Sequence, residues 1–213
     1  MSSRLPDSLF HAVEARLDHV PLRVLRSGYA ALSKGYREQT VSEAERADLI
    51  ADGPGTSAPG GGFTPARARG LGYLAARFPA TYAAAQAALR QVPDAALAGC
   101  ESVLDLGSGP GTATWALMER WPALQQATFL ESDAEMLSHA QALAVAFPDL
   151  KVSLKSGDLT ARLAEAEPHD IVVMAYVLSE LDEAAQSVLL SQAWAKAKHG
   201  LLLLEPGTPE TSR

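Results

Sequence analysis

Short apolar runs alternate with helix-length segments between residues 100 and 205, and this rhythm restricts the fold more than any other feature of the chain. The apolar runs read SVLDL, ATFLE, KVSLK, DIVVMAY and GLLLLE, and the segments between them cover residues 112–121, 133–147, 159–166 and 181–198. Strands that alternate with helical crossovers form a parallel sheet with helices on both faces. We therefore predict an α/β fold with a Rossmann-like, doubly wound parallel sheet.

The first 98 residues have a different pattern and predict an all-helical extension. Leu9, Val13 and Leu17 recur at helical spacing, Pro21 is expected to separate two helices, and Thr64-Pro65 has the residue types that begin another. Residues 52–62, DGPGTSAPGGG, have the composition of a flexible linker. We predict two domains, a helical region at 1–98 that contains this linker and a ligand-binding domain at 99–213.

Charge and cysteine content limit the classes of function. The net charge of −7 divides into +2 for residues 1–98 and −9 for residues 99–213. This distribution disfavours DNA binding and makes the first half the better candidate for any contact with RNA. Cys100 is the only cysteine, which excludes an internal disulfide and a cysteine-built metal site, and no metal site is predicted.

No apolar run approaches the roughly 20 residues that span a bilayer. The first twenty residues also lack the continuous apolar segment of a signal peptide. We therefore expect a cytoplasmic protein without membrane association.

Ligands of doubly wound sheets bind beyond the carboxyl ends of the strands, where Gly107-Ser-Gly109-Pro-Gly111 follows the first strand. Asp105 precedes this motif; it would repel a pyrophosphate and attract a cation. The third glycine also comes one residue too early for the dinucleotide fingerprint. Both details favour S-adenosylmethionine (SAM), which carries a sulfonium and an amino group and no phosphate. The alternative role of Asp105 is to brace the loop.

Two further acids follow the next strands. Glu131 ends the second strand, where an acid can accept hydrogen bonds from ribose hydroxyls. Asp158 follows the third strand and is predicted to accept from the adenine amino group, with Leu159 near the ring; its alternative role is a helix cap. Asp133 is predicted to be the N-cap of the following helix.

The segments VLDLGSGPGT, FLESDAEML, SGDL and DIVVMAYVLSEL resemble the successive motifs of class I SAM-dependent methyltransferases. The resemblance covers residues 100–205 and implies SAM as the cofactor. A narrower resemblance is carried by LPDSLFHAVEARL, YLAARFPATYAAAQAAL, GSGPGT, YVLSEL and LLLLEPGTPE. These resemble bacterial relatives of the mitochondrial small-subunit ribosomal methyltransferase-like assembly family. That family implies association with the small ribosomal subunit or its RNA, and a C-terminal part whose cysteines hold an iron–sulfur cluster.

The chain departs from both families near its end. It extends only eight residues past Glu205 and lacks the family's cysteines. The class I fold normally adds two more strands at this point. We expect a sheet without its final strands, and a fragment or truncated product.

The predicted site gathers residues from all of these strand ends. Cofactor contacts are predicted at Asp105, Gly107, Ser108, Gly109, Gly111, Thr112, Glu131, Ser132, Asp158, Leu159, Tyr176 and Val177. Glu180 and Glu205 are the acids nearest the expected acceptor position and are predicted to contact the substrate; the alternative roles for them are at a helix start and in bracing a loop. No catalytic residue is predicted, because methyl transfer from a sulfonium depends mainly on alignment of the reactants.

The sequence therefore predicts a SAM-dependent methyltransferase that acts on ribosomal RNA or a ribosomal protein of the small subunit. One alternative is a non-catalytic ribosome assembly factor that retains the SAM-binding fold. Another is a small-molecule methyltransferase. The methyl acceptor and the oligomeric state stay open.

Overall fold

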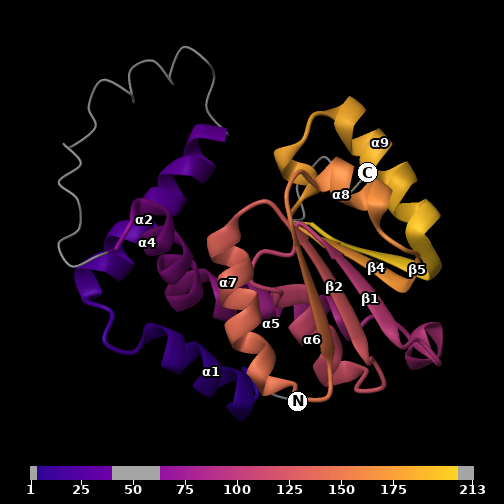
Figure 1. Ribbon diagram of the computed structural model, residues 1–213, viewed down its shortest axis with the longest axis horizontal. Helices are drawn as coiled ribbons and strands as arrows, with labels where there is room; N and C mark the ends of the chain where they lie inside the picture. The colour runs from indigo at the N-terminus through magenta and orange to yellow at the C-terminus, as the bar shows by residue number, and fades with distance from the viewer. Residues whose placement is uncertain (1–3, 40–62, 206–213) are drawn as a thin grey trace. The chain divides into compact units, whose positions relative to one another are not determined.

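A computed structural model describes residues 4–39 and 63–205 (Figure 1). The predicted linker at residues 52–62 lies outside the described part. Every described element before residue 98 is helical, as predicted. The helices are α1 (Asp7–Leu17), α2 (Leu22–Gln39), α4 (Pro65–Gly72), the π-helical turn η1 (Tyr73–Arg77), α5 (Phe78–Leu89) and the 3₁₀ turn η2 (Asp94–Leu97).

Two predicted signals explain where these helices begin and end. Pro21 falls between α1 and α2, and Thr64 caps α4 by accepting a hydrogen bond from the N–H of Arg67 at 3.1 Å. Pro79 does not interrupt the helical stretch, because it occupies the first turn of α5, where a missing N–H is tolerated.

Five parallel strands form the sheet, in the order β3-β2-β1-β4-β5. They are β1 (Ser102–Leu106), β2 (Gln126–Glu131), β3 (Lys151–Ser156), β4 (His169–Ala175) and β5 (Ala197–Leu204). The strand order reverses between β1 and β4, which pair directly although β2 and β3 separate them in sequence. The carboxyl ends of β1 and β4 thus flank the position where ligands bind in such sheets. The predicted Rossmann-like sheet is confirmed.

Four helices make the crossovers between the strands. They are α6 (Thr112–Arg120), α7 (Ala134–Leu143), α8 (Leu159–Glu165) and α9 (Glu183–Lys196). Because crossovers in parallel sheets are right-handed, α6 and α7 cover one face, and α8 and α9, which lie together in Figure 1, cover the other. One buried cluster between the sheet and the second pair of helices contains Leu104, Leu106, Leu130, Leu163, Val172, Met174, Val177, Leu189 and Ala193.

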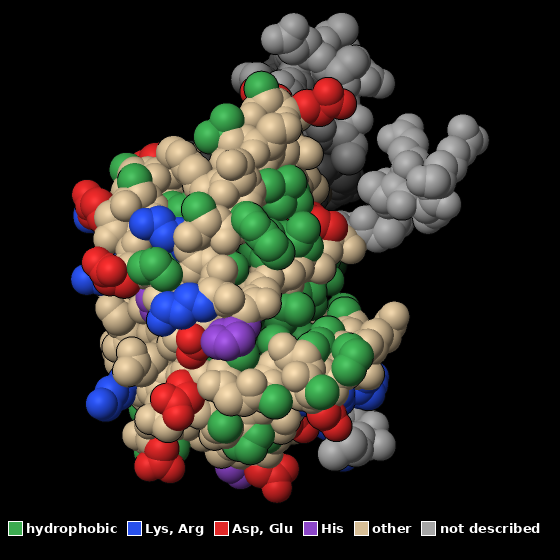
Figure 2. Space-filling view, turned by 90° about the vertical axis from the view of Figure 1, so that its right-hand side faces the viewer, with side chains coloured by type: hydrophobic (Ala, Val, Ile, Leu, Met, Phe, Trp, Pro, Cys, Tyr) green, Lys and Arg blue, Asp and Glu red, His purple; other side chains and the backbone are tan. Residues whose placement is uncertain are grey.

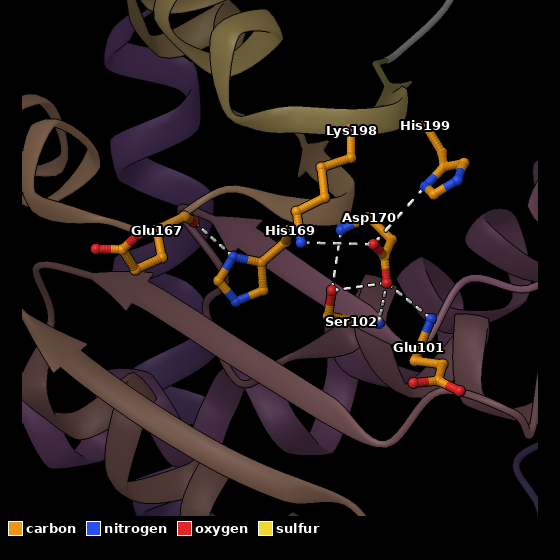
Figure 3. Close-up of polar contacts among 7 residues, drawn as sticks. All are labelled: Glu101, Ser102, Glu167, His169, Asp170, Lys198 and His199. Carbon is orange, nitrogen blue, oxygen red and sulfur yellow. Dashed lines mark hydrogen bonds and ion pairs between the residues drawn. The ribbon is translucent and has the colours of Figure 1, made fainter.

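Asp170 joins three strands at the end of the sheet opposite the carboxyl ends (Figure 3). Its Oδ2 accepts hydrogen bonds from the N–H of Glu101 and from the N–H and hydroxyl of Ser102, at 2.9–3.0 Å. Lys198 and His199 of β5 approach Oδ1 at 3.7 Å. Burial opposes ionisation, but these hydrogen bonds and Lys198 outweigh it and lower the pKa of Asp170.

The chain forms two compact units, one of residues 1–12 and 81–213 and one of residues 13–80. The predicted domain boundary at residue 99 stays a prediction. Within the second unit, α2 and α4 cross with their backbones in close contact. A Cβ at Gly28 would lie 1.8 Å from the Ala68 carbonyl oxygen, and one at Gly72 would lie 2.5 Å from the Tyr29 nitrogen.

Hydrophobic side chains gather on the face that carries α9 and β5 (Figure 2). Val188 and Trp194 of α9 and Leu203 of β5 are 53%, 67% and 47% exposed. Among residues 4–39 and 63–205, no helix combines the length and apolarity needed to cross a membrane.

Candidate functional site

The glycine-rich segment forms a turn between β1 and α6, with left-handed backbone at all three glycines. The φ angles are +63° at Gly107, +54° at Gly109 and +84° at Gly111. A Cβ at Gly107 would lie 2.6 Å from the Val177 side chain, and one at Gly111 would lie 2.7 Å from the Trp115 indole nitrogen. A Cβ at Gly109 would meet nothing within 4 Å. A side chain at Gly107 or Gly111 would therefore overlap a neighbouring side chain, whereas the backbone of Gly109 has open space beside it.

Hydrogen bonds from β2 hold this turn in place. The N–H groups of Gly107 and Ser108 donate to the Leu130 carbonyl at 2.8 and 3.2 Å. The N–H of Gly109 donates to Glu131 Oε2 at 2.8 Å. The turn is therefore fixed to the carboxyl end of the neighbouring strand.

Asp105 lies in the core beneath the turn, with only 1% of its surface exposed. The Thr114 hydroxyl donates to Asp105 Oδ2 at 2.7 Å, and the Thr114 backbone also hydrogen-bonds to the carboxyl. Burial, and to a smaller extent the nearby charge of Glu131, outweigh these hydrogen bonds and raise the pKa of Asp105 to about 7. The carboxyl therefore titrates near neutral pH.

Glu131 connects the glycine turn to the start of α7. While Oε2 accepts from Gly109, Oε1 accepts from the N–H of Asp133 at 2.9 Å and from the Ser132 hydroxyl at 3.3 Å. Asp133 is the N-cap of α7, which confirms that prediction; it accepts from Glu135 and Met136 at 2.9 and 3.4 Å.

Asp158 is exposed and caps α8, and its Oδ1 accepts a hydrogen bond from the N–H of Ala161 at 2.9 Å. This is the alternative role noted for it above. Leu159 is partly buried against the core cluster. The N–H of Gly157 donates to the Glu131 carbonyl at 3.2 Å, so the loop after β3 lies beside the end of β2. The adenine contact predicted for Asp158 stays a prediction.

The segment after β4 is held by the end of β5. Tyr176 has a left-handed φ of +63°, and its N–H donates to the Leu204 carbonyl at 2.8 Å. Glu205 Oε1 accepts from the N–H groups of both Val177 and Leu178 at 2.9 Å. Glu205 Oε2 is buried without a hydrogen-bond partner. Since Val177 contacts Gly107, Glu205 helps to shape the glycine turn from two strands away.

Charge of one sign accumulates at these strand ends. Loss of hydration, followed by the charges of Glu131 and Glu205, raises the pKa of Glu180, although the residue as a whole is exposed. Burial and the charge of Glu205 raise the pKa of the Tyr176 phenol. Glu131 at the end of β2 and Glu205 after β5 therefore lie close enough to Glu180, which follows β4, to raise its pKa.

Hydrogen bonds and close contacts join Gly107, Ser108, Gly109, Glu131, Ser132, Val177 and Glu205 into one network around the turn, and Asp105 lies beneath it, bonded to Thr114. The side chains of Asp158, Tyr176 and Glu180 are not hydrogen-bonded to this network, so the structure does not join them to the other predicted site residues. Thr112 is buried beside the turn, and its hydroxyl has no hydrogen-bond partner. Sequence reasoning missed Thr114 and Trp115. Their position in the first turns of α6, directly after the glycine motif, is the signal that could have indicated contacts with the strand and the turn. Within the described ranges, no group of three or more acidic, histidine or cysteine residues could hold a metal ion.

Comparison with known proteins identifies the family. The sequence model described as mitochondrial small ribosomal subunit Rsm22 matches residues 67–213, which is more than half of the chain. The chain belongs to the Rsm22 family.

A human relative of this Rsm22 family member is the mitochondrial ribosome assembly protein METTL17. It is 30% identical over 144 residues, which are 65% of this chain and 32% of METTL17. The chain thus spans about a third of the length of that relative.

Solved methyltransferase structures support the fold of this Rsm22 family member. The mitomycin 7-O-methyltransferase MmcR aligns with a TM-score of 0.51 and 21% identity, over 98% of this chain and 59% of its own. An O-methyltransferase family 2 protein from Planctomyces limnophilus aligns with a TM-score of 0.52 and 23% identity, over 65% and 41%. At these identities the likeness concerns the fold, which is that of Rossmann-like methyltransferases.

Proposed function

We propose that this chain binds SAM at the carboxyl ends of β1, β2 and β4 and serves as a methyltransferase linked to the small ribosomal subunit. The observation that carries the proposal is the environment of Gly109. Its N–H is bonded to Glu131 while the space where a side chain would project is open. Bare backbone next to a strand-end acid suits a ligand that combines ribose hydroxyls with a positive charge.

The residues present suit SAM in several ways. Glu131 Oε2 accepts only the bond from Gly109 and can accept one more, and the long bond from the Ser132 hydroxyl to Oε1 can be exchanged, so ribose hydroxyls can bind without breaking the bonds to Gly109 and Asp133. The buried Asp105 would favour the amino group and sulfonium through its negative charge. The Thr112 hydroxyl lacks a partner and can bond to a ligand at the turn.

The other predicted contacts complete the proposed pocket. Asp158 and Leu159 would face the adenine, and Tyr176 and Val177 would form a wall. Bound SAM would supply an electrophilic methyl group, and the protein would align the acceptor with it. Glu180 and Glu205 are proposed to orient that acceptor, because their charges act on the same region and Glu205 has an oxygen to spare.

The ribosomal assignment rests on the family description and on the name of METTL17 as a ribosome assembly protein. We propose the small ribosomal subunit, through its RNA or a protein, as the partner, and the cytoplasm as the location. A second candidate is an assembly factor that binds SAM without turnover, which the name of METTL17 as a ribosome assembly protein favours.

Isothermal titration with SAM tests the cofactor proposal, with NAD as the matched negative ligand. We expect saturable SAM binding and a flat NAD titration. Glu131→Ala should weaken SAM binding ~10–100-fold through loss of charge-assisted hydrogen bonds. Glu131→Gln keeps an acceptor for Gly109, so its SAM affinity should lie between those of Glu131→Ala and the natural protein. A flat SAM titration with folded protein would remove the cofactor assignment.

A further inference from the structure

Trp115 is completely buried behind the glycine turn and contacts it directly. Its indole N–H donates to the Pro110 carbonyl at 2.6 Å. The indole nitrogen also lies 2.7 Å from the position that a Cβ on Gly111 would occupy. The ring is therefore in contact with two consecutive residues of the turn.

Two aromatic neighbours fix the orientation of the Trp115 ring. Phe129 of β2 packs edge-on against it, with ring centroids 5.2 Å apart and an interplanar angle of 82°. Phe147 stacks on it at the same centroid distance with an interplanar angle of 5°. With both neighbours in place, the indole N–H has little freedom to leave the Pro110 carbonyl.

The hydrogen bond gives a partner to a carbonyl that lies just before the helix, because Gly111 is the N-cap of α6. The Thr114 backbone bonds to the Asp105 carboxyl, and the N–H of Trp115 bonds to the Gly111 carbonyl at 2.9 Å. The carbonyl of Pro110 instead receives a side-chain donor from Trp115. The peptide between Pro110 and Gly111 is thereby held at the point where the turn enters α6.

We propose that Trp115 is a positioning residue of the cofactor site, whose indole N–H fixes the Pro110 peptide and so keeps the Gly109 backbone directed at Glu131 with its open side toward the ligand. The effect on SAM affinity rests on the proposed function. The effect on the turn itself does not, because every contact involved is present without a ligand.

A positioning role and a purely structural role for Trp115 predict different effects of substitution on SAM affinity. Trp115→Phe keeps an aromatic ring in the core and removes the N–H, whereas Phe147→Leu removes the stacked ring and keeps the N–H. Trp194→Phe, at a residue that is 67% exposed, is the matched control. A positioning role predicts that Trp115→Phe weakens SAM binding by about 5- to 30-fold. Phe147→Leu should lower the thermal midpoint and change the SAM affinity less than about threefold.

Hydrogen exchange of the ligand-free protein separates this inference from the proposed function. Peptides that cover residues 107–112 should exchange faster in Trp115→Phe than in the natural protein, Phe147→Leu or Trp194→Phe. If the natural protein fails to bind SAM, the proposed function is lost and the exchange result alone decides the role of Trp115. Equal exchange in Trp115→Phe and Phe147→Leu, after correction for stability, overturns the inference.

The indole signals of the natural protein give a second test that does not depend on the folding of Trp115→Phe. The chain has three tryptophans, so the Trp115 N–H signal in a ¹⁵N spectrum can be assigned by elimination with Trp121→Phe and Trp194→Phe. We expect this signal to exchange slowly and to shift on addition of SAM more than the other two. An indole N–H of Trp115 that exchanges as fast as that of Trp194 overturns the inference.

Discussion

At the scale of single residues, Asp105 connects ligand preference with pH. Its carboxyl is buried and hydrogen-bonded to Thr114, and no described cation contacts it. A buried acid with a pKa of about 7 is neutral in mildly acidic solution and carries a costly charge above neutral pH. A cationic ligand would stabilise the charged form, so binding of such a ligand should release protons near pH 7.

Asp105→Asn is expected to change stability in a pH-dependent way. The native carboxyl, with its raised pKa, retains its proton where the unfolded chain has lost it, so the stability of the natural protein falls as pH rises from about 4 through about 7. Between pH 5 and pH 8, the free energy of unfolding of the natural protein should fall by roughly 1–3 kcal/mol more than that of Asp105→Asn. Urea unfolding of both proteins across this range measures the difference. A difference that does not vary with pH would show that Asp105 does not titrate there.

Strand-end residues of the site could be predicted from the sequence because the parallel sheet places them in one region whatever their side-chain angles. Gly107, Glu131 and the cap at Asp133 follow from that rule. The bond between Asp105 and Thr114 and the bonds of Trp115 could not be predicted, because they depend on which side chains α6 directs at the strand and at the turn. The bond from Glu205 to the segment after β4 required the pairing of β4 with β5.

At the scale of secondary-structure elements, Asp170 fixes the relative position of three strands. β1 and β4 are distant in sequence, and their pairing starts where Asp170 bonds to Glu101 and Ser102. The contacts to Lys198 and His199, whose side chains are about half exposed, add little because water screens them. Asp170 therefore supports the start of the β1–β4 pairing mainly through its bonds to Glu101 and Ser102.

Asp170→Asn should destabilise the fold by roughly 1–3 kcal/mol at neutral pH, because charge-assisted hydrogen bonds from two backbone N–H groups are weakened. The pKa of Asp170 is lowered in the native state, so this stabilisation is present above the unfolded value near 4 and is lost as pH falls through the lower native value. Urea unfolding at pH 7 and below pH 4 checks both the size and the direction. Asp149→Asn, at an exposed acid, is the control and should have no effect at either pH.

The extents of four strands follow closely from their apolar runs, but β5 begins earlier than predicted. Its apolar run starts at Gly200, whereas the strand starts at Ala197. The residues between include Lys198 and His199, whose polarity does not suggest a strand. Lys198 and His199 lie in an irregularity of the β4–β5 pairing, between the pairs His169–Ala197 and Ile171–Gly200. An apolar run predicts the buried part of a strand. It does not predict the part of β5 in which exposed polar residues extend the strand at the edge of the sheet.

At the scale of the whole molecule, charge separates the two halves of the chain. Residues 99–213 carry a net −9, which includes the three glutamates of the proposed pocket, and the charges of Glu131 and Glu205 raise the pKa of Glu180. If the proposed partner is RNA, we expect residues 1–98 to contact it, because their net charge is slightly positive and that of the other half is negative.

Transfer of labelled methyl groups decides between the two candidate functions. We expect purified small ribosomal subunits to accept label from SAM, and free small-molecule acceptors not to. Glu180→Gln should reduce transfer at least ~10-fold with SAM affinity unchanged, since the residue is proposed to orient the acceptor and not the donor. SAM binding without transfer to any subunit preparation would favour the assembly factor without turnover.

The close crossing of α2 and α4 has a consequence for how the family can diverge. Alanine favours an isolated helix over glycine by about 1 kcal/mol, so drift toward alanine should be common on helices. At Gly28 and Gly72 the first side-chain carbon would overlap the backbone of the other helix. Glycine should therefore persist at these two positions in homologues whose neighbouring residues have changed. Homologues that lack both glycines should not pack these two helices in the same way.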